Sequence, residues 1–174
     1  LGTVVVKKCM EHSNLNGSEV NTVILGQVLQ AGCGQNPARQ TAINSGIDKD
    51  KTATTINQVC GSGLAAITLG FSSLKLNDTN IVIAGGQESM TNSPHYLNYR
   101  MEKDLNEEKL KDTMLIDGLI DAYDDCHMGV TAENVAEKYQ ITRNDQDNFA
   151  FNSQKKAIKA ISENKFKEEI VPIK

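Results

Sequence analysis

Apolar residues along the first half of the chain alternate between a helical spacing and short continuous runs. Intervals of three and four residues predict helices, and runs rich in β-branched residues predict strands. Six elements are expected in this order: helix 3–15, strand 21–28, helix 38–44, strand 52–56, helix 64–76 and strand 81–84. This alternation is typical of an α/β doubly wound protein with a parallel sheet and helices on both faces. We therefore expect ligands at the carboxyl ends of the strands.

The helix predicted over 64–76 has an unusual composition. Leu64, Ala65 and Ala66 make its start apolar nearly all round. A helix without a polar face is normally covered on every side, so we expect this helix to be buried.

After Met90 the pattern becomes irregular. Residues 91–128 are loop-like and are expected to leave the core, with short helical pieces over 105–110 and 114–123. The cluster Glu102–Lys111 mixes charges of both signs, which is typical of a solvated surface segment.

Helical spacing returns at Thr131. Thr142 precedes an acidic first turn and is expected to cap a helix that continues from Asp145 to Ser162. Residues 170–173 are expected to begin a strand or an extended link.

The candidate catalytic residue lies in the turn between the strand 52–56 and the helix 64–76. Cys60 lies there, followed by Gly61 and Gly63, and a helix N-terminus favours a thiolate. A tight turn of this kind can expose a nucleophile. The alternative from the residues alone is that Cys60 is a small buried apolar side chain.

The run Asn57-Gln58-Val59-Cys60-Gly61-Ser62-Gly63 resembles the nucleophilic-cysteine motif of the thiolases, the acyl-CoA C-acyltransferases. Further stretches resemble this family, and they occur in family order over nearly the whole chain: 26–32, 34–40, 83–90, 112–114, 117–119, 127–136, 153–154 and 169–172.

The resemblance implies a thiolase-like layered α/β fold, present as an incomplete N-terminal domain with part of the loop domain. Residues 1–90 would be the N-terminal core without its first strand. Residues 91–130 would begin the loop domain and carry an oligomerisation segment, and residues 131–174 would be its helical part. The C-terminal thiolase domain would be absent.

The resemblance also implies a reaction. Cys60 would attack an acyl-CoA carbonyl and hold the acyl group as a thioester, with its backbone N–H in an oxyanion hole. Acetyl-CoA and acetoacetyl-CoA would be the substrates, with CoA as substrate carrier and neither cofactor nor metal. Leu119, His127 and Met128 would lie beside the pantetheine and acyl group, where a methionine shortens the pocket. Alternatively, His127 caps a loop and Met128 is a core residue.

Composition narrows the possible partners. The 174 residues carry a net charge of −4 and no basic patch, which argues against nucleic acid. No apolar run reaches the roughly 18 residues of a membrane span. The four cysteines are too far apart in sequence for a disulfide framework or a zinc site, so a cytoplasmic location is expected. Residues 93–110 resemble the segment through which thiolases form tetramers, so a homo-oligomer, tetramer or dimer, is expected.

The chain also departs from the thiolase pattern. The family's first strand, expected in the middle of the sheet, and its C-terminal half with further catalytic residues are not found in the sequence. A missing central strand would leave backbone groups unpaired at roughly 1–3 kcal/mol each. We expect this chain to be part of a longer polypeptide and inactive alone. Three alternatives remain: a non-catalytic fragment that acts only in assembly, a 3-ketoacyl-CoA thiolase for acyl groups of another length, and a β-ketoacyl synthase.

Overall fold

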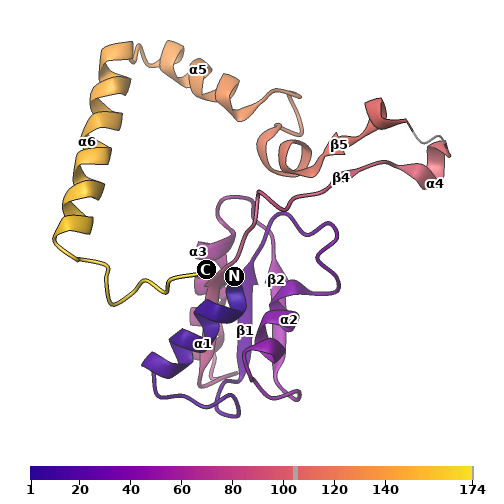
Figure 1. Ribbon diagram of the computed structural model, residues 1–174, viewed down its shortest axis with the longest axis vertical. Coiled ribbons are helices and arrows are strands. Elements are labelled where there is room, and N and C mark those ends of the chain that lie inside the picture. Colours follow the sequence, from indigo (N-terminus) through magenta and orange to yellow (C-terminus); the bar gives the residue numbers. More distant parts are fainter. Residues whose placement is uncertain (104–105, 174) are drawn as a thin grey trace. The chain divides into compact units, whose positions relative to one another are not determined.

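The computed structural model describes residues 1–103 and 106–173. These residues form two compact units, 1–118 and 119–172, and each has its own arrangement of elements (Figure 1). The domain boundaries expected at residues 90 and 130 stay predictions.

All six elements predicted in the first half of the chain are present. In chain order they are α1 (Gly2–His12), β1 (Thr22–Gly26), α2 (Pro37–Asn44), β2 (Thr52–Ile56), α3 (Ser62–Lys75) and β3 (Val82–Gly86). Asn36 caps α2 by accepting from the Arg39 N–H, and Pro37 fills its first turn. A proline is well placed there because the first N–H groups of a helix have no partner within it.

The three strands form a parallel sheet in the order β2-β1-β3. Thr22 of β1 pairs with Thr52 of β2 on one side and with Val82 of β3 on the other. The expectation of a gap in the middle of the sheet is therefore wrong. After β2 the chain crosses to the other side of β1, where β3 pairs directly with β1. Among the described strands, only the outer edges of β2 and β3 remain for a further strand.

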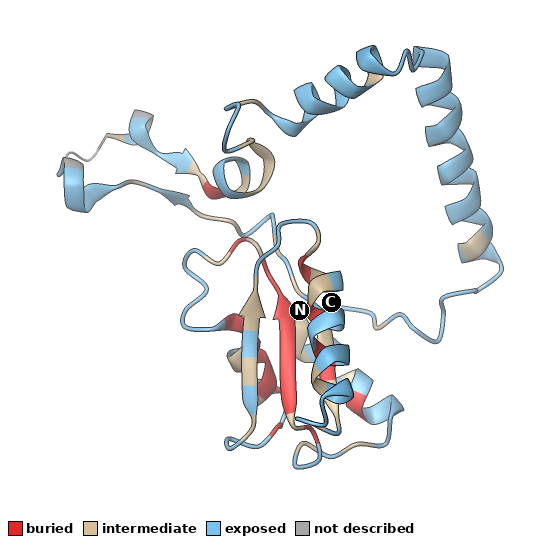
Figure 2. Ribbon diagram, turned by 180° about the vertical axis from the view of Figure 1, so that it is seen from behind, coloured by how far each residue is buried: buried red, intermediate tan, exposed pale blue. Residues whose placement is uncertain are grey.

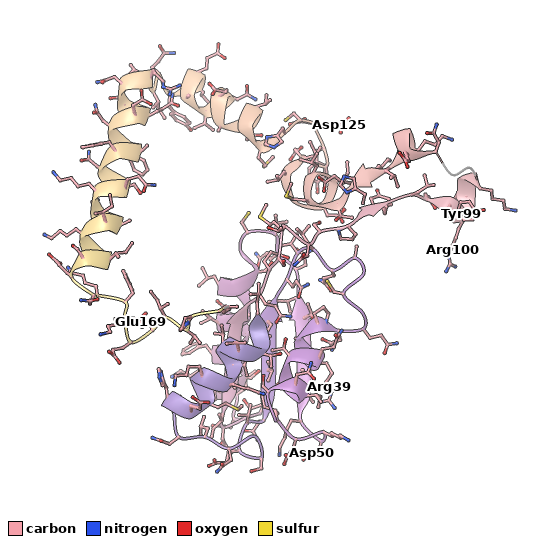
Figure 3. The ribbon with its side chains drawn as sticks, in the orientation of Figure 1. Arg39, Asp50, Tyr99, Arg100, Asp125 and Glu169 are labelled. Carbon is pink, nitrogen blue, oxygen red and sulfur yellow. The ribbon has the colours of Figure 1, made fainter. Side chains whose placement is uncertain are left out.

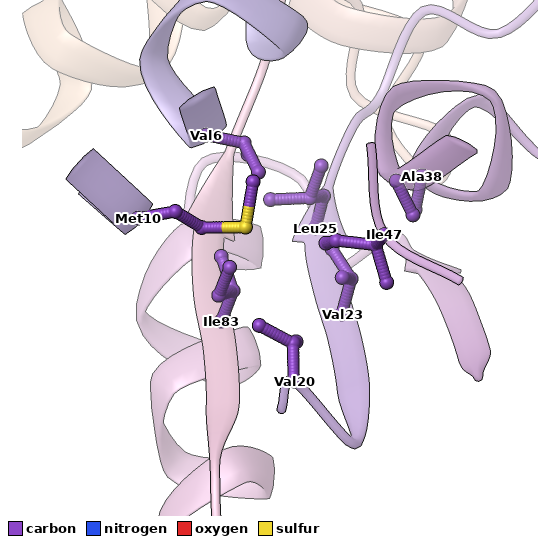
Figure 4. Packing of buried hydrophobic residues seen from close by; sticks show 9 residues of the cluster. Val6, Met10, Val20, Val23, Leu25, Ala38, Ile47 and Ile83 are labelled. Carbon is purple, nitrogen blue, oxygen red and sulfur yellow. The ribbon is translucent and has the colours of Figure 1, made fainter. Parts of the chain in front are cut away.

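Helices α1 and α2 cover one face of this sheet. Val6 and Met10 of α1 meet Val23 and Leu25 of β1 and Ile83 of β3 in a buried cluster (Figure 4). Successive strand residues point to opposite faces. The alternate positions of β1 therefore face α3, the helix on the other side of the sheet.

Helix α3 is not buried on all sides, so that expectation is wrong for the described residues. Small residues form its inner face: Ala66 is fully buried, and a Cβ on Gly70 would lie 3.0 Å from Val82. The larger apolar side chains point outward, where Leu64 is 70% and Phe71 58% exposed (Figure 2). The helix is apolar on both faces, and the sheet covers one of them.

A hairpin follows β3. Its elements are β4 (His95–Tyr96), α4 (Tyr99–Glu102), a 3₁₀ turn η1 (Glu107–Lys109) and β5 (Lys111–Asp112). The two strands pair antiparallel. The helical piece predicted over 105–110 is this single 3₁₀ turn within the described residues, and Leu105 lies outside them.

The base of the hairpin is fixed by one buried hydroxyl. Thr113 is 1% exposed, and its Oγ1 donates to the Pro94 carbonyl at 2.6 Å and lies 2.5 Å from the Ser93 hydroxyl. A short helix follows and ends in a π-helical turn, η2 (Leu115–Leu119). The helical piece predicted over 114–123 therefore stops early, because Ile120 leaves it to form a bridge with His127.

The second unit contains α5 (Met128–Lys138) and α6 (Arg143–Ser162), which confirms both predicted helices. Thr142 caps α6 as expected. Its hydroxyl and its backbone N–H donate to the Asp145 carboxylate at 2.6 and 3.0 Å, and these bonds lower the pKa of Asp145. Residues 170–173 form no strand.

Candidate active site

Cys60 lies in the turn that joins β2 to α3, at the carboxyl edge of the sheet, and its side chain is exposed. The alternative of a buried apolar cysteine is therefore wrong for the described residues. Gly61 is the N-cap residue of α3, so the thiol comes immediately before the helix N-terminus. The positive end of the helix dipole and the first N–H groups of the helix favour negative charge there. Activation of Cys60 as a thiolate stays a prediction.

The residue before Cys60 has an unusual backbone conformation. Val59 has a φ of +48°, and a β-branched residue rarely adopts the left-handed region. Hydrogen bonds from neighbouring residues hold its backbone groups. The Asn57 Oδ1 accepts from the Val59 N–H at 2.8 Å, and the Ser62 hydroxyl donates to the Val59 carbonyl at 2.5 Å. The same hydroxyl accepts from the Gln58 N–H at 2.8 Å. We did not predict these roles of Asn57 and Ser62, although an asparagine two residues before a turn peptide is a recognised turn signal.

The N-terminus of α3 lies directly against the end of β1. A Cβ built on Gly26 would be 2.6 Å from two Ser62 atoms and 2.8 Å from the Gly63 nitrogen. The N-terminus of α3 can therefore lie this close to β1 only because residue 26 is a glycine. The neighbouring Gly86 of β3 would place a Cβ 3.6 Å from Gly63, an ordinary contact.

A second group of polar side chains lies at the carboxyl ends of β1 and β3. Gln87 donates to Gln27 and accepts from the Thr41 hydroxyl, and Glu88 accepts from the N–H groups of Val28 and Leu29. Gln27, Gln87 and Glu88 line a cavity of about 340 Å³ together with residues of α1 and α2. Cys60 does not line this cavity, so the sequence motif and the cavity are separate features.

The other three predicted site residues lie in the second unit. The bridge between Ile120 and His127 brings Leu119 beside His127 and Met128. His127 caps α5, since its Nδ1 accepts from the Gly129 N–H at 2.9 Å. A substrate contact would have to use Nε2, and that contact stays a prediction. Met128 is 39% exposed, so the alternative of a core methionine is wrong for the described residues.

Within the described residues, neither a cluster of metal-binding side chains nor a membrane-spanning helix is present. No group of three or more histidine, cysteine, aspartate or glutamate side chains within 1–103 and 106–173 is arranged to hold a metal ion. Within the same residues, every helix is too short or too polar to cross a membrane.

Comparison with known proteins adds to this geometry. The sequence profile described as "Thiolase, N-terminal domain" matches residues 1–174. The acetyl-CoA acetyltransferase of Thiocystis violacea is 51% identical over 99% of this chain and 44% of its own length. The acetyl-CoA acetyltransferase of Cupriavidus necator is also 51% identical, again over 44% of its length. The Acat5 thiolase of Ascaris suum, solved in complex with coenzyme A, superposes with a TM-score of 0.93 at 38% identity, over 99% of this chain and 45% of its own.

The fold and the turn define an α/β protein that presents a cysteine thiol at a helix N-terminus. The chain belongs to the thiolase family and matches its N-terminal domain. It spans less than half the length of the relatives described.

Proposed function

We propose that the protein to which this chain belongs is an acetyl-CoA C-acetyltransferase that acts through an acyl-cysteine intermediate. The observation that carries this proposal is the exposed Cys60 before the N-terminus of α3, within a chain of the thiolase family. The names of the acetyl-CoA acetyltransferase relatives support acetyl-CoA as substrate.

The proposed reaction has two steps. In the first, the Cys60 thiolate attacks the thioester carbonyl of acetyl-CoA, a new C–S bond forms and CoA leaves as a thiolate that takes a proton. In the second, a carbanion formed by removing a proton from another acetyl-CoA attacks the acyl-cysteine. Acetoacetyl-CoA forms and Cys60 is released as thiolate. Thiolysis of acetoacetyl-CoA is the same sequence in reverse.

Two features of Cys60's position suit it to the first step. The negative charge of the thiolate before attack, and that of the carbonyl oxygen in the tetrahedral intermediate, both lie at the positive end of α3. The backbone N–H of Cys60 is proposed as one donor to that oxygen. Groups that remove and return the protons are proposed to lie outside this chain.

Leu119, His127 and Met128 are proposed to contact the pantetheine and acyl part of the substrate. This proposal is supported by the bridge between Ile120 and His127, which brings the three residues together in one part of the second unit. Met128, 39% exposed, has a flexible apolar side chain that would limit the length of the acyl group.

A homo-oligomer and a cytoplasmic location are also proposed. The hairpin of β4 and β5 carries exposed apolar surface at Tyr96, Tyr99 and Met101, which suits a contact between copies. The four thiols of the chain are free, which suits a reducing compartment. Light scattering of the purified protein and fractionation of the cells test these two statements.

The test of the reaction is the intact mass of the protein at its natural length, before and after incubation with acetyl-CoA. One added acetyl group, absent in Cys60→Ala and retained in Cys33→Ala, is the expected result. Cys33 is the matched control because it is another exposed thiol of the same unit. An acetyl group that persists in Cys60→Ala would refute the assignment of the nucleophile.

The same assay separates the alternatives. A β-ketoacyl synthase would take the acyl group from acyl carrier protein and leave acetyl-CoA unused. A protein that acts only in assembly would gain no acyl group from either donor, but it would still associate through its exposed apolar surfaces.

A further inference from the structure

We propose that Ser62 and Asn57 are positioning residues for Cys60: together they hold Val59 in its left-handed conformation and so fix the direction of the nucleophile. This inference rests on the proposed function and adds two residues to it. Neither side chain needs to touch substrate for this role.

The backbone of the turn is strained at Val59. Its φ of +48° is disfavoured for a β-branched side chain, so the conformation persists only where surrounding bonds impose it. Val59 is 49% exposed, so packing of its own side chain cannot be the main constraint. The constraint must come from its backbone groups.

Those backbone groups are held from both sides. The Asn57 carboxamide oxygen accepts from the N–H of Val59, and the Ser62 hydroxyl donates to its carbonyl. The Ser62 N–H donates to the same carbonyl at 3.1 Å. The carbonyl of Val59 belongs to the peptide that carries the Cys60 N–H, so fixing one end of that peptide orients the other.

Ser62 is itself held in place. It is 5% exposed and lies against Gly26, where there is no room for a larger neighbour. Its hydroxyl makes two bonds, to Gln58 and to Val59, so its direction is determined twice. Asn57 is exposed and makes one bond to the turn. We therefore expect Ser62 to contribute more than Asn57.

Loss of the Ser62 hydroxyl would release the peptide between Val59 and Cys60. Val59 would then relax toward negative φ, and both the thiol and the N–H of Cys60 would turn away from the N-terminus of α3. A displacement of about 1 Å at a reacting group can lower a rate by about a hundredfold. The proposed role of this peptide concerns the reacting sulfur and the oxyanion donor, so the effect should fall on the rate of acyl transfer.

The experiment compares Ser62→Ala, Asn57→Ala and Asn57→Asp in the protein at its natural length. Single-turnover acetylation of Cys60 is measured over a range of acetyl-CoA concentrations. We expect Ser62→Ala to lower the maximal rate about 10- to 100-fold with a half-saturating concentration changed less than about threefold. Asn57→Ala should show a smaller loss, and Asn57→Asp should restore the rate because it keeps the acceptor oxygen.

Two further variants separate positioning from general structure. Ser72→Ala removes another hydroxyl of α3 that bonds a backbone carbonyl, and it should leave the rate unchanged. Val59→Gly removes the penalty for positive φ, so adding it to Ser62→Ala should recover most of the lost rate. A role in structure alone predicts lower thermal stability in Ser62→Ala and no recovery of rate by Val59→Gly.

The outcomes distinguish this inference from the proposed function. If Ser62→Ala keeps its maximal acetylation rate within twofold of the unaltered protein, the positioning role is overturned while the proposed function stands. If the unaltered protein takes up no acetyl group, the proposed function fails. The rate of iodoacetamide reaction at Cys60, followed by peptide mapping in the same variants, then decides the positioning role. If Ser62→Ala does not fold, the Asn57→Ala and Asn57→Asp pair gives the decision.

Discussion

Replacing Gly26 by alanine tests whether α3 is seated directly on the end of β1. The added Cβ would lie 2.6 Å from the Ser62 carbonyl carbon and Cβ and 2.8 Å from the Gly63 nitrogen. Ordinary contacts are near 3.5–4.0 Å, so the overlap is about 1 Å. Most of the atoms it meets are backbone, which cannot rotate away, so the helix N-terminus has to move.

The expected cost follows from this overlap. Overpacking of this kind costs about 1–3 kcal/mol. Alanine also gains about 0.4–1 kcal/mol by restricting the unfolded chain, so a net loss of about 1–2 kcal/mol is expected. With a urea dependence of about 1–3 kcal/mol per molar, the midpoint of unfolding should fall by roughly 1 M.

Urea unfolding of the full chain, followed by circular dichroism, measures the loss of stability. Hydrogen exchange at the β1 amides locates that loss in the sheet. Gly85→Ala is the matched control: it is a glycine of β3 paired with Leu25, and a Cβ there would meet nothing within 4 Å. Equal stability of the Gly26→Ala and Gly85→Ala proteins would refute the close seating of α3.

Three further predictions concern other parts of the chain. Thr113→Val should cost about 1–3 kcal/mol and raise exchange in the hairpin, because the buried hydroxyl that bonds the Pro94 carbonyl and the Ser93 hydroxyl is lost, whereas Thr113→Ser should not. The lowered pKa of Asp145 means that its contribution to α6 is complete above the unfolded value near 3.9 and is lost as pH falls through the folded value. Helical circular dichroism should therefore decrease as the pH falls below about 4, and Asp145→Asn should remove that dependence. Arg39, labelled in Figure 3, lies on α2. It donates to two loop carbonyls, so Arg39→Lys, with a single ammonium group, should lower the unfolding midpoint and Arg39→Ala should lower it further.

The hydrophobic pattern was sufficient for most of the first unit. The predicted strands and helices exist because β-branched runs and helical spacing act locally, and Pro37 and Thr142 mark helix starts by their own chemistry. The order of the strands was not accessible in the same way. β3 could pair directly with β1, or a further strand could lie between them. The choice depends on contacts between residues 60 positions apart, and the local hydrophobic pattern carries no information about such contacts.

The candidate site was predicted only in part. Cys60 could be singled out because glycines and a helix follow it directly. The roles of Asn57 and Ser62 could not be predicted. They depend on a positive φ at Val59, and a valine in the sequence does not indicate a positive φ. His127 illustrates a third case: the alternative prediction was that it caps a loop, and the structure shows that it caps helix α5.

The position of Cys60 between β2 and β3 has a consequence for synthesis on the ribosome. Strand β1 pairs with β2 across 30 positions and with β3 across 60. Closing the longer loop costs only about 0.6 kcal/mol more, but β3 must first be made. At 5–20 residues per second, it follows Cys60 by about 1–5 s. A nascent chain therefore carries the thiol for that time before β3, one of the two strands against which α3 mainly packs, has been made, so the thiol precedes the complete sheet that supports its turn.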